Sequence, residues 1–196
     1  MSYFFKNDED FVSVMDILLL CCIETNDFNR IDMKKAIVVG ATSGIGKEVA
    51  IILSERGYRI GVAGRRENLM QELVDNHRNI VAYKIIDITK DGADDELLQF
   101  VSELGGIDLY FHSSGIGYQN PQLDAEKELR TVETNVKGFT RMIDAMYEYF
   151  SVKGGGHIAV ISSIAGTKGL GAAPAYSATK RYQNHYIEAL SQLSSM

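Results

Sequence analysis

Tyr176 and Lys180 lie four residues apart near the end of the sequence, and their side chains have complementary proton chemistry. On a helix, residues at this spacing share one face, with their Cβ atoms about 5–6 Å apart. An ammonium group beside a phenol stabilises the phenolate, so it lowers the pKa of a tyrosine from about 10 towards neutrality. Such a phenol can donate or accept a proton at physiological pH. The pair therefore predicts an acid–base site, although the same spacing also occurs on solvated helix faces.

A glycine-rich turn in the first third of the sequence indicates a phosphate-binding site. The β-branched run at residues 35–39 leads into Gly40-Ala41-Thr42-Ser43-Gly44-Ile45-Gly46, and a helix-period stretch follows. A strand, a glycine-rich turn and a helix in this order direct backbone N–H groups and the positive helix end towards a pyrophosphate. A Walker-type loop is excluded, because that motif has a serine or threonine after its lysine and here Glu48 follows Lys47.

The strand pattern that precedes the tyrosine ends in hydroxyl residues. Residues 158–161 are apolar, and Ser162 and Ser163 follow them, thirteen residues before Tyr176. In a parallel sheet, a hydroxyl at the carboxyl end of a strand faces the ligand crevice. The sequence therefore predicts that Ser163 lies in the same crevice as the tyrosine. A turn residue at the strand end is the alternative interpretation.

The end of the second strand pattern bears on the choice of cofactor. Dinucleotide folds that select NAD place an Asp or Glu there for the ribose 2′-hydroxyl, whereas an Arg accommodates a 2′-phosphate. This sequence has Gly64-Arg65-Arg66 at that point, and guanidinium groups pair well with phosphate. NADP(H) is therefore predicted in preference to NAD(H). The alternative is a solvated arginine at the start of a helix, paired with Glu67.

Together these motifs resemble those of the short-chain dehydrogenase/reductase family, which are nicotinamide-dependent oxidoreductases with a Rossmann fold. The resemblance extends from about residue 34 to about residue 193. The family's glycine motif matches Gly40, Gly44 and Gly46, and its Tyr-x-x-x-Lys motif matches Tyr176 and Lys180. The agreement of several spaced motifs is a strong signal, whereas any one of them is weak.

Further family motifs fall on other parts of the sequence. The catalytic serine matches Ser163, the Asn-x-x-Gly motif matches residues 135–138, and the acidic residue near the adenine matches Asp87. After the fourth strand pattern, His112-Ser113-Ser114-Gly115 replaces the family's Asn-Asn-Ala-Gly, so the glycine is kept and the asparagines are absent. His112 is interpreted as a hydrogen-bonding residue at a strand end, and no metal site is predicted.

The resemblance also implies a role for each matched residue. Tyr176 is expected to act as general acid in carbonyl reduction and as general base in alcohol oxidation, with Lys180 assisting it and binding the nicotinamide ribose. Ser163 is expected to hold the substrate oxygen, and Asn135 to position a water for proton relay; a helix cap is the alternative for Asn135. The implied catalytic residues are Asn135, Ser163, Tyr176 and Lys180; the implied cofactor-binding residues are Gly40, Thr42, Ser43, Gly44, Ile45, Gly46, Arg65, Arg66, Asp87, Ile88, Ser114, Gly115, Asn135, Tyr176 and Lys180.

Strand and helix patterns alternate along most of the sequence. Such alternation predicts an α/β fold of the Rossmann type, a doubly wound parallel sheet in a three-layer α/β/α arrangement with right-handed crossovers. We expect strands at residues 35–39, 58–63, 80–86, 107–111 and 158–161, and helices at residues 67–74, 94–104, 126–150 and from 174 onwards, besides the one after the glycine-rich turn.

The two ends of the sequence depart from this pattern. Residues 1–32 are expected to be an N-terminal extension before the NAD(P)-binding domain at 33–196, with residues 11–23 either an amphipathic helix or a segment without function. The apolar part is too short for a transmembrane helix, which needs roughly 20 residues. After the tyrosine helix the family's final strands are missing, so we expect an incomplete sheet with an exposed edge that invites pairing with another chain.

Composition sets the remaining expectations. The 196 residues suit one domain, and 45% hydrophobic and 23% charged residues are ordinary for a globular protein. The net charge of −6 without a basic block argues against nucleic acid, and the adjacent Cys21 and Cys22 form neither a disulfide framework nor a zinc spacing. A cytoplasmic setting, a small-molecule substrate, no membrane association and a homodimer or homotetramer are predicted.

Two functions of different class remain. The favoured one is an NADP(H)-dependent oxidoreductase that acts on a carbonyl or alcohol substrate. The alternative is a non-catalytic dinucleotide-binding or interaction protein derived from a truncated reductase, which keeps the site residues by inheritance. NADPH oxidation that depends on Tyr176 would distinguish them.

Overall fold

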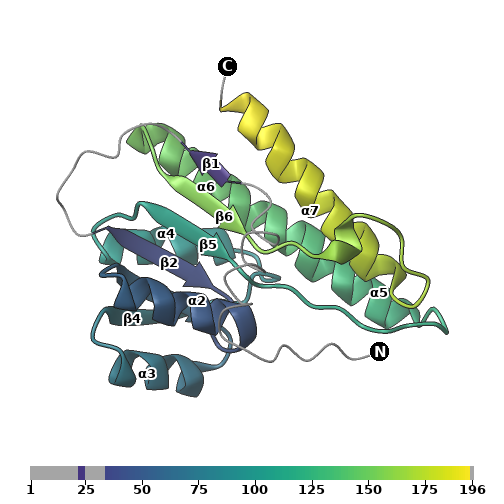
Figure 1. Cartoon of the computed structure of the whole chain (residues 1–196), viewed down its shortest axis with the longest axis horizontal. Coiled ribbons are helices and arrows are strands. Elements are labelled where there is room, and N and C mark those ends of the chain that lie inside the picture. Colours follow the sequence, from purple (N-terminus) through teal and green to yellow (C-terminus); the bar gives the residue numbers. More distant parts are fainter. Residues whose placement is uncertain (1–21, 25–33, 195–196) are drawn as a thin grey trace.

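In the part of the chain that the structure describes, a six-stranded sheet organises the fold, in the spatial order β1-β6-β5-β2-β3-β4. The computed structural model describes residues 22–24 and 34–194 (Figure 1). Strands β2 to β6 run parallel, and β1 alone runs antiparallel, at the outer edge of β6. The strands are β1 (Cys22–Glu24), β2 (Lys35–Val39), β3 (Arg59–Gly64), β4 (Ile80–Ile85), β5 (Leu109–His112) and β6 (His157–Val160).

Helices connect the parallel strands, as the alternating pattern predicts. Proline at the first position of α7 suits a helix start, since its missing N–H has no intrahelical partner there. The left-handed Gly154 ends α6, as glycine commonly does after a helix. The helices are α2 (Gly44–Glu55), α3 (Glu67–Asn76), α4 (Ala93–Glu103), α5 (Ala125–Val132), η1 (Glu133–Gly138), α6 (Phe139–Lys153), η2 (Ile164–Gly166) and α7 (Pro174–Leu193).

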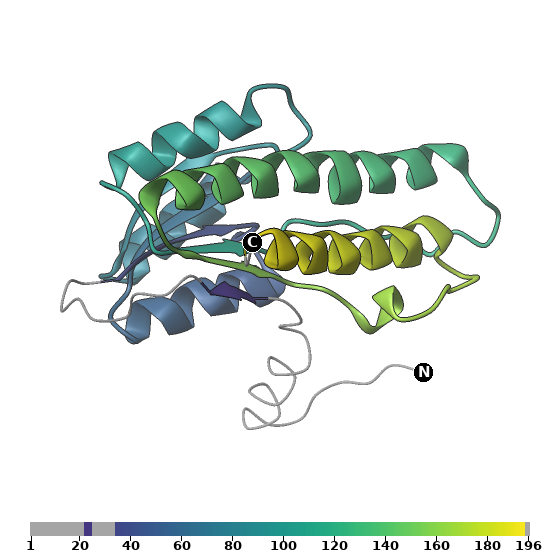
Figure 2. The same cartoon turned by 90° about the horizontal axis from the view of Figure 1, so that it is seen from above.

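The central strands β2, β3 and β5 are largely buried on both faces, which explains why most of their residues are apolar. Side chains of a strand alternate between faces, so Ile37 and Val39 enter one core while Ala36 and Val38 enter the other. The first core takes its helical side chains mainly from α4 and α6, and the second from α2 and α3. Figure 2 shows α2 and the α4–α6 layer on opposite sides of the sheet. The predicted three-layer Rossmann-type fold is confirmed.

The long helix predicted at residues 126–150 is divided into three parts. Between α5 and α6, residues Glu133–Gly138 form a π-helical turn, a feature that often marks functional sites. Asn135 therefore lies inside a long helix and not at its start. Gly138 lets this helix approach the chain after β4, because a Cβ at this position would lie 2.8 Å from the carbonyl oxygen of Ile88.

The outer edge of β6 differs from expectation. The structure pairs Cys22 with Ala159, Ile23 with Ile158 and Glu24 with His157, so over these positions the same chain covers the edge that we predicted to be exposed. The physical reason is that an edge strand offers unpaired N–H and C=O groups to any extended segment. The helix considered for residues 11–23 lies outside the described residues except at its end, where residues 22 and 23 form a strand.

Removing β1 is expected to increase self-association. A chain that begins at Met33 lacks Cys22–Glu24, so the ladder groups of β6 that they satisfy become free to pair with a second molecule. Light scattering after size-exclusion chromatography should give a mass that rises more steeply with concentration than for the full chain. A variant lacking only residues 1–10 keeps β1 and is the control. Equal concentration dependence of the mass for the two truncated chains and the full chain would contradict this role of β1.

Among the described residues, no helix combines the length and apolar character needed to cross a membrane.

Candidate active site

A cavity of about 870 Å³ opens where the parallel strands end. Its walls come from the segments that follow β2, β3, β4, β5 and β6, together with α7. The strands β2 and β5 are neighbours, but the chain leads from β2 to β3 on one side of the sheet and from β5 to β6 on the other. Open α/β sheets bind ligands at such a switch point. Of the predicted site residues, the cavity is lined by Gly40, Thr42, Ser43, Ile45, Arg65, Arg66, Asp87, Ile88, Ser114, Gly115, Ser163, Tyr176 and Lys180, whereas Gly44, Gly46 and Asn135 are not part of its lining.

The glycine-rich turn packs tightly against the segment after β5. Gly40 has φ +90°, and a Cβ on it would lie 2.6 Å from the backbone nitrogen of Ser114. A side chain at Gly46 would collide with the carbonyl oxygen of Gly40, so α2 can begin directly against the turn. Ser43 at the helix N-cap makes no side-chain cap, and the first turn carries no acidic residue. The first N–H groups of α2 are therefore available to an anion.

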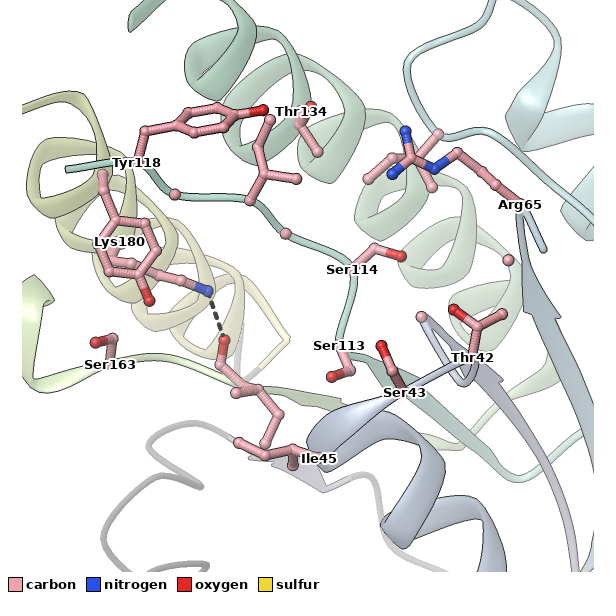
Figure 3. Close-up of a pocket in the computed structure, with 18 of the residues that line it drawn as sticks. Thr42, Ser43, Ile45, Arg65, Ser113, Ser114, Tyr118, Thr134, Ser163 and Lys180 are labelled. Carbon is pink, nitrogen blue, oxygen red and sulfur yellow. Dashed lines mark hydrogen bonds between the residues drawn. The ribbon is translucent and has the colours of Figure 1, made fainter. Parts of the chain in front are cut away.

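The two arginines after β3 have different environments. Arg66 donates to Thr42 Oγ1 from Nε at 3.0 Å and to Ser43 Oγ from Nη2 at 2.7 Å, so its guanidinium is tied to the glycine-rich turn. Arg65 is exposed and extends over the cavity, on the same side as Thr42 and Ser43 (Figure 3). The region can therefore present two positive charges to a phosphate group, and the one on Arg66 is fixed by hydrogen bonds to the turn.

The segment after β4 forms the wall next to the arginines. Asp87 Oδ1 accepts hydrogen bonds from Thr89 Oγ1 at 2.8 Å and from Thr89 N at 3.1 Å. Burial raises the pKa of Asp87, but these hydrogen bonds and the positive charges of Arg65 and Lys90 outweigh it and hold the pKa below its ordinary value. The carboxylate is therefore ionised at neutral pH.

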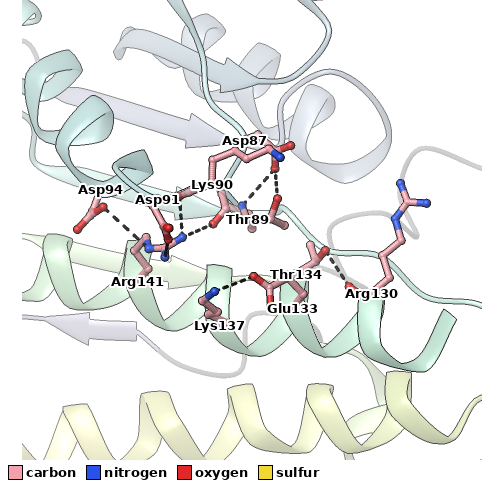
Figure 4. Close-up of polar contacts among 11 residues, drawn as sticks. Asp87, Thr89, Lys90, Asp91, Asp94, Arg130, Glu133, Thr134, Lys137 and Arg141 are labelled. Carbon is pink, nitrogen blue, oxygen red and sulfur yellow. Dashed lines mark hydrogen bonds and ion pairs between the residues drawn. The ribbon is translucent and has the colours of Figure 1, made fainter. Parts of the chain in front are cut away.

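Arg141 of α6 binds the segment that follows β4. Its guanidinium donates to the carbonyl oxygen of Lys90 at 2.7 Å and pairs with Asp91 at 2.7 Å (Figure 4). A weaker contact reaches the carbonyl oxygen of Ile88 at 3.3 Å. Three acceptors on one guanidinium restrict the loop, so the cavity wall at residues 87–88 is held by the helix beneath it.

Tyr176 and Lys180 both reach the cavity from α7. Tyr176 is half-buried, and Lys180 Nζ lies 6.0 Å from the centre of its ring. The Lys180 side chain is buried, and this burial lowers its pKa to about 8. Its Nζ donates to the carbonyl oxygen of Ile161 at 3.0 Å and to Gln183 Oε1 at 2.9 Å.

Ser163 lies on the same side of the cavity as Lys180, opposite Arg65 (Figure 3). Its Oγ accepts a hydrogen bond from Ala165 N at 3.1 Å and thereby caps the short helix η2. A hydroxyl has one donor and two acceptor positions, so this contact leaves its O–H free to donate to a ligand. The neighbouring Ser162 is buried and donates to Asn184 Oδ1.

Asn135 lies behind the wall and is fully buried. Its Oδ1 accepts from Ile116 N at 2.9 Å, and its Nδ2 donates to Ile116 O at 2.7 Å and to Thr179 Oγ1 at 3.1 Å. The amide thus joins the segment after β5 to α7. By binding Ile116, Asn135 holds the next residue, Gly117, close to Tyr176. A Cβ on Gly117 would collide with the Tyr176 ring.

His112 stands where the family's first asparagine is expected. It is buried, with Nδ1 2.8 Å from the Tyr110 hydroxyl and Nε2 3.1 Å from the carbonyl oxygen of Ser114. Because that carbonyl can only accept, Nε2 carries the proton and Nδ1 accepts from Tyr110. Burial and the charge of Lys180 lower the pKa of His112 to about 3, so the ring is neutral at physiological pH.

Sequence reasoning missed two residues that support the site. Gln183 binds Lys180, and its position on the helix face of Tyr176 and Lys180, three residues beyond the lysine, is a signal that could have identified it. Glu128 of α5 accepts from Ala175 N at 2.8 Å and from Asn120 Nδ2 at 2.7 Å, so it caps the helix that carries the tyrosine. No local pattern marks Glu128, because its partners are distant in the sequence.

Known proteins resemble this chain in sequence and in fold. The profile of the family described as short chain dehydrogenase matches residues 34–195. An uncharacterized oxidoreductase of Myxococcus xanthus is 32% identical over 163 residues, which cover 80% of this chain and 64% of the relative. This chain thus spans slightly less than two thirds of that relative's length.

Two solved structures are similar as well. A crystal structure of an actinorhodin polyketide ketoreductase variant with NADPH is 29% identical with a TM-score of 0.74, over 81% of this chain and 64% of that one. A short-chain type dehydrogenase/reductase from Mycobacterium marinum is 30% identical with a TM-score of 0.73, over 80% and 67%.

Proposed function

We propose, because the chain belongs to the short-chain dehydrogenase/reductase family, that it transfers a hydride between NADP(H) and a carbonyl or alcohol group of a small molecule. The observation that supports this most directly is that Tyr176, Lys180 and Ser163 line one cavity together with the glycine-rich turn. An acid–base group, a cation and a hydroxyl donor thus surround the space in which a substrate oxygen can bind.

The residues of the cavity fit a dinucleotide. The uncapped first turn of α2 can bind a pyrophosphate, and Arg65 and Arg66 can pair with a 2′-phosphate. Asp87 and Ile88 form the wall on which we propose that the adenine rests. The bound nicotinamide supplies the hydride. The preference for NADP(H) is further supported by the similar ketoreductase, whose crystal structure contains NADPH.

The chain's own groups handle the proton and the substrate oxygen. In carbonyl reduction, the Tyr176 hydroxyl gives its proton to the substrate oxygen, and in alcohol oxidation it takes that proton back. The Ser163 hydroxyl donates a hydrogen bond to the same oxygen and stabilises the charge that develops there. Lys180 supplies a positive charge beside the tyrosine and binds the nicotinamide ribose. We propose a supporting role for Asn135, because its side chain engages Ile116 and Thr179.

The test is a turnover assay with the full chain. We expect NADPH oxidation, followed by the absorbance of reduced nicotinamide, with at least one member of a panel of ketones and aldehydes, and NADP⁺ reduction with the corresponding alcohol. NADPH binding without turnover over the panel would support the non-catalytic alternative. Failure to bind either NADPH or NADH would overturn both. The cytoplasmic setting and a homodimer or homotetramer belong to the same proposal, and light scattering measures the latter.

A further inference from the structure

The amide of Gln183 joins two parts of the site that lie on different helices. Its Oε1 accepts a hydrogen bond from Lys180 Nζ at 2.9 Å, and its Nε2 donates to the carbonyl oxygen of Asn135 at 2.9 Å. The Gln183 side chain is 1% exposed. Both ends of the amide are thus committed to buried partners, and rotation of the side chain would break both contacts.

The contact with Lys180 determines where the ammonium points. An ammonium has three donors in a fixed tetrahedral arrangement. Within the described part of the chain, two of them are directed to Ile161 O at 3.0 Å and to Gln183 Oε1. Two fixed bonds define the direction of the third N–H. Lys180 lines the cavity, so this third donor is left for a ligand.

The contact with Asn135 stabilises the π-helical turn. A side chain that binds a helix carbonyl from outside is one of the recognised causes of a local break in helix hydrogen bonding. The turn Glu133–Gly138 presents the Asn135 side chain to Ile116, and through it supports the segment that carries Gly117. Gln183 therefore contacts both the lysine and the turn that positions the wall beside Tyr176.

The charges around Lys180 show why it matters that its acceptor, the Gln183 amide, is uncharged. The titratable groups that face Lys180 are Tyr176 on its own helix and His112 on β5, which is neutral. Within residues 34–194, no carboxylate forms an ion pair with Lys180. A carboxylate in place of the Gln183 amide would hold the ammonium charged, whereas the amide orients it without adding a negative charge.

We propose that Gln183 is a positioning residue of this site, which aims the Lys180 ammonium into the cavity and couples it to the Asn135 turn. The inference rests on the proposed function only for its effect on turnover. The two hydrogen bonds of Gln183 are present in the full chain without cofactor, so they can be tested separately from turnover.

The decisive measurement is the titration of the Lys180 side chain by NMR in protein labelled with ¹³C and ¹⁵N lysine. Gln183→Met keeps the length of the side chain but removes the acceptor, so the titration midpoint of Lys180 should fall below its value in the unmodified chain. Gln183→Glu keeps an acceptor and adds a negative charge, so the midpoint should rise. Gln192→Met, an exposed change on the same helix, should leave it unchanged.

A second measurement needs no variant. In the unmodified protein, the side-chain amide protons of Gln183 should exchange with deuterated water much more slowly than those of exposed Gln192. Equal exchange rates, or midpoints that fail to move in opposite directions in folded Met and Glu variants, would overturn the proposal. If the variants do not fold, the exchange comparison decides alone.

Turnover gives the catalytic readout. Once a substrate is found, kcat of Gln183→Met should fall about 10-fold, the size typical of losing a partner that orients a functional group. Its pH profile should shift in the direction of the Lys180 midpoint, and Gln183→Glu should shift in the opposite direction. A protein without turnover on any substrate would contradict the proposed function, yet the Lys180 titration would still test Gln183.

Discussion

Replacement of Tyr176 by phenylalanine is expected to lower kcat for carbonyl reduction by about 10²–10⁴-fold, the range attributed to general acid–base catalysis. The ring stays in place against Gly117, so the shape of the cavity is preserved and only the transferable proton is removed. NADPH affinity should remain close to that of the unmodified chain, because the glycine-rich turn and the arginines are untouched. Steady-state kinetics together with a fluorescence titration of NADPH separate the two effects.

Tyr182→Phe is the matched control for this experiment. Tyr182 lies on the same helix and loses the same hydroxyl, but that hydroxyl bonds Thr140 Oγ1 at 2.8 Å and the residue does not line the cavity. It should therefore retain nearly full activity. If Tyr176→Phe kept full activity, the tyrosine would not be the proton donor and the mechanism would be wrong.

Arg65→Ser is expected to weaken NADPH binding about 10–100-fold while leaving NADH binding almost unchanged. A hydrogen bond to a charged group contributes about 1.5–3 kcal/mol, and each 1.4 kcal/mol corresponds to about a factor of ten in affinity. Arg65 extends over the cavity beside the turn, where a 2′-phosphate would meet its guanidinium. Only NADP(H) carries that phosphate, so the loss should be selective. Equilibrium titration with both cofactors measures it.

The control removes the same charge elsewhere. Arg78 is exposed and lies outside the cavity lining, so Arg78→Ser should change neither affinity. Equal losses for NADPH and NADH in Arg65→Ser would show that Arg65 contacts a part common to both cofactors, and would remove the argument for NADP(H). Arg66→Ser should affect both cofactors, because Arg66 also holds Thr42 and Ser43 of the turn.

The parallel strands, their helices and the location of the crevice follow from local patterns. Apolar runs such as residues 35–39 specify strands buried on both faces, and a glycine-rich turn specifies the helix that comes next. Because the carboxyl ends of parallel strands share one edge, Ser163 and Arg65 were expected near the same opening, and both line the cavity.

The remaining features depend on contacts between distant segments. Glu128 bonds Ala175 across 47 residues, and the amide of Gln183 reaches Asn135 across 48. No local sequence pattern predicts either contact, because Glu and Gln are common on helices and their partners here are known only once the helices are packed together. The division of the long helix by a π-helical turn is of the same kind, since its residues have no pattern that separates them from an α-helix.

The strand at Cys22–Glu24 has a consequence for how the protein folds during synthesis. Cys22 pairs with Ala159, 137 positions later (159 − 22), so β1 can find its partner only after the other described strands have been synthesised. Contacts of such high contact order form slowly, because chain closure must precede them. We expect nascent chains that end before β6 to contain the central sheet without this ladder.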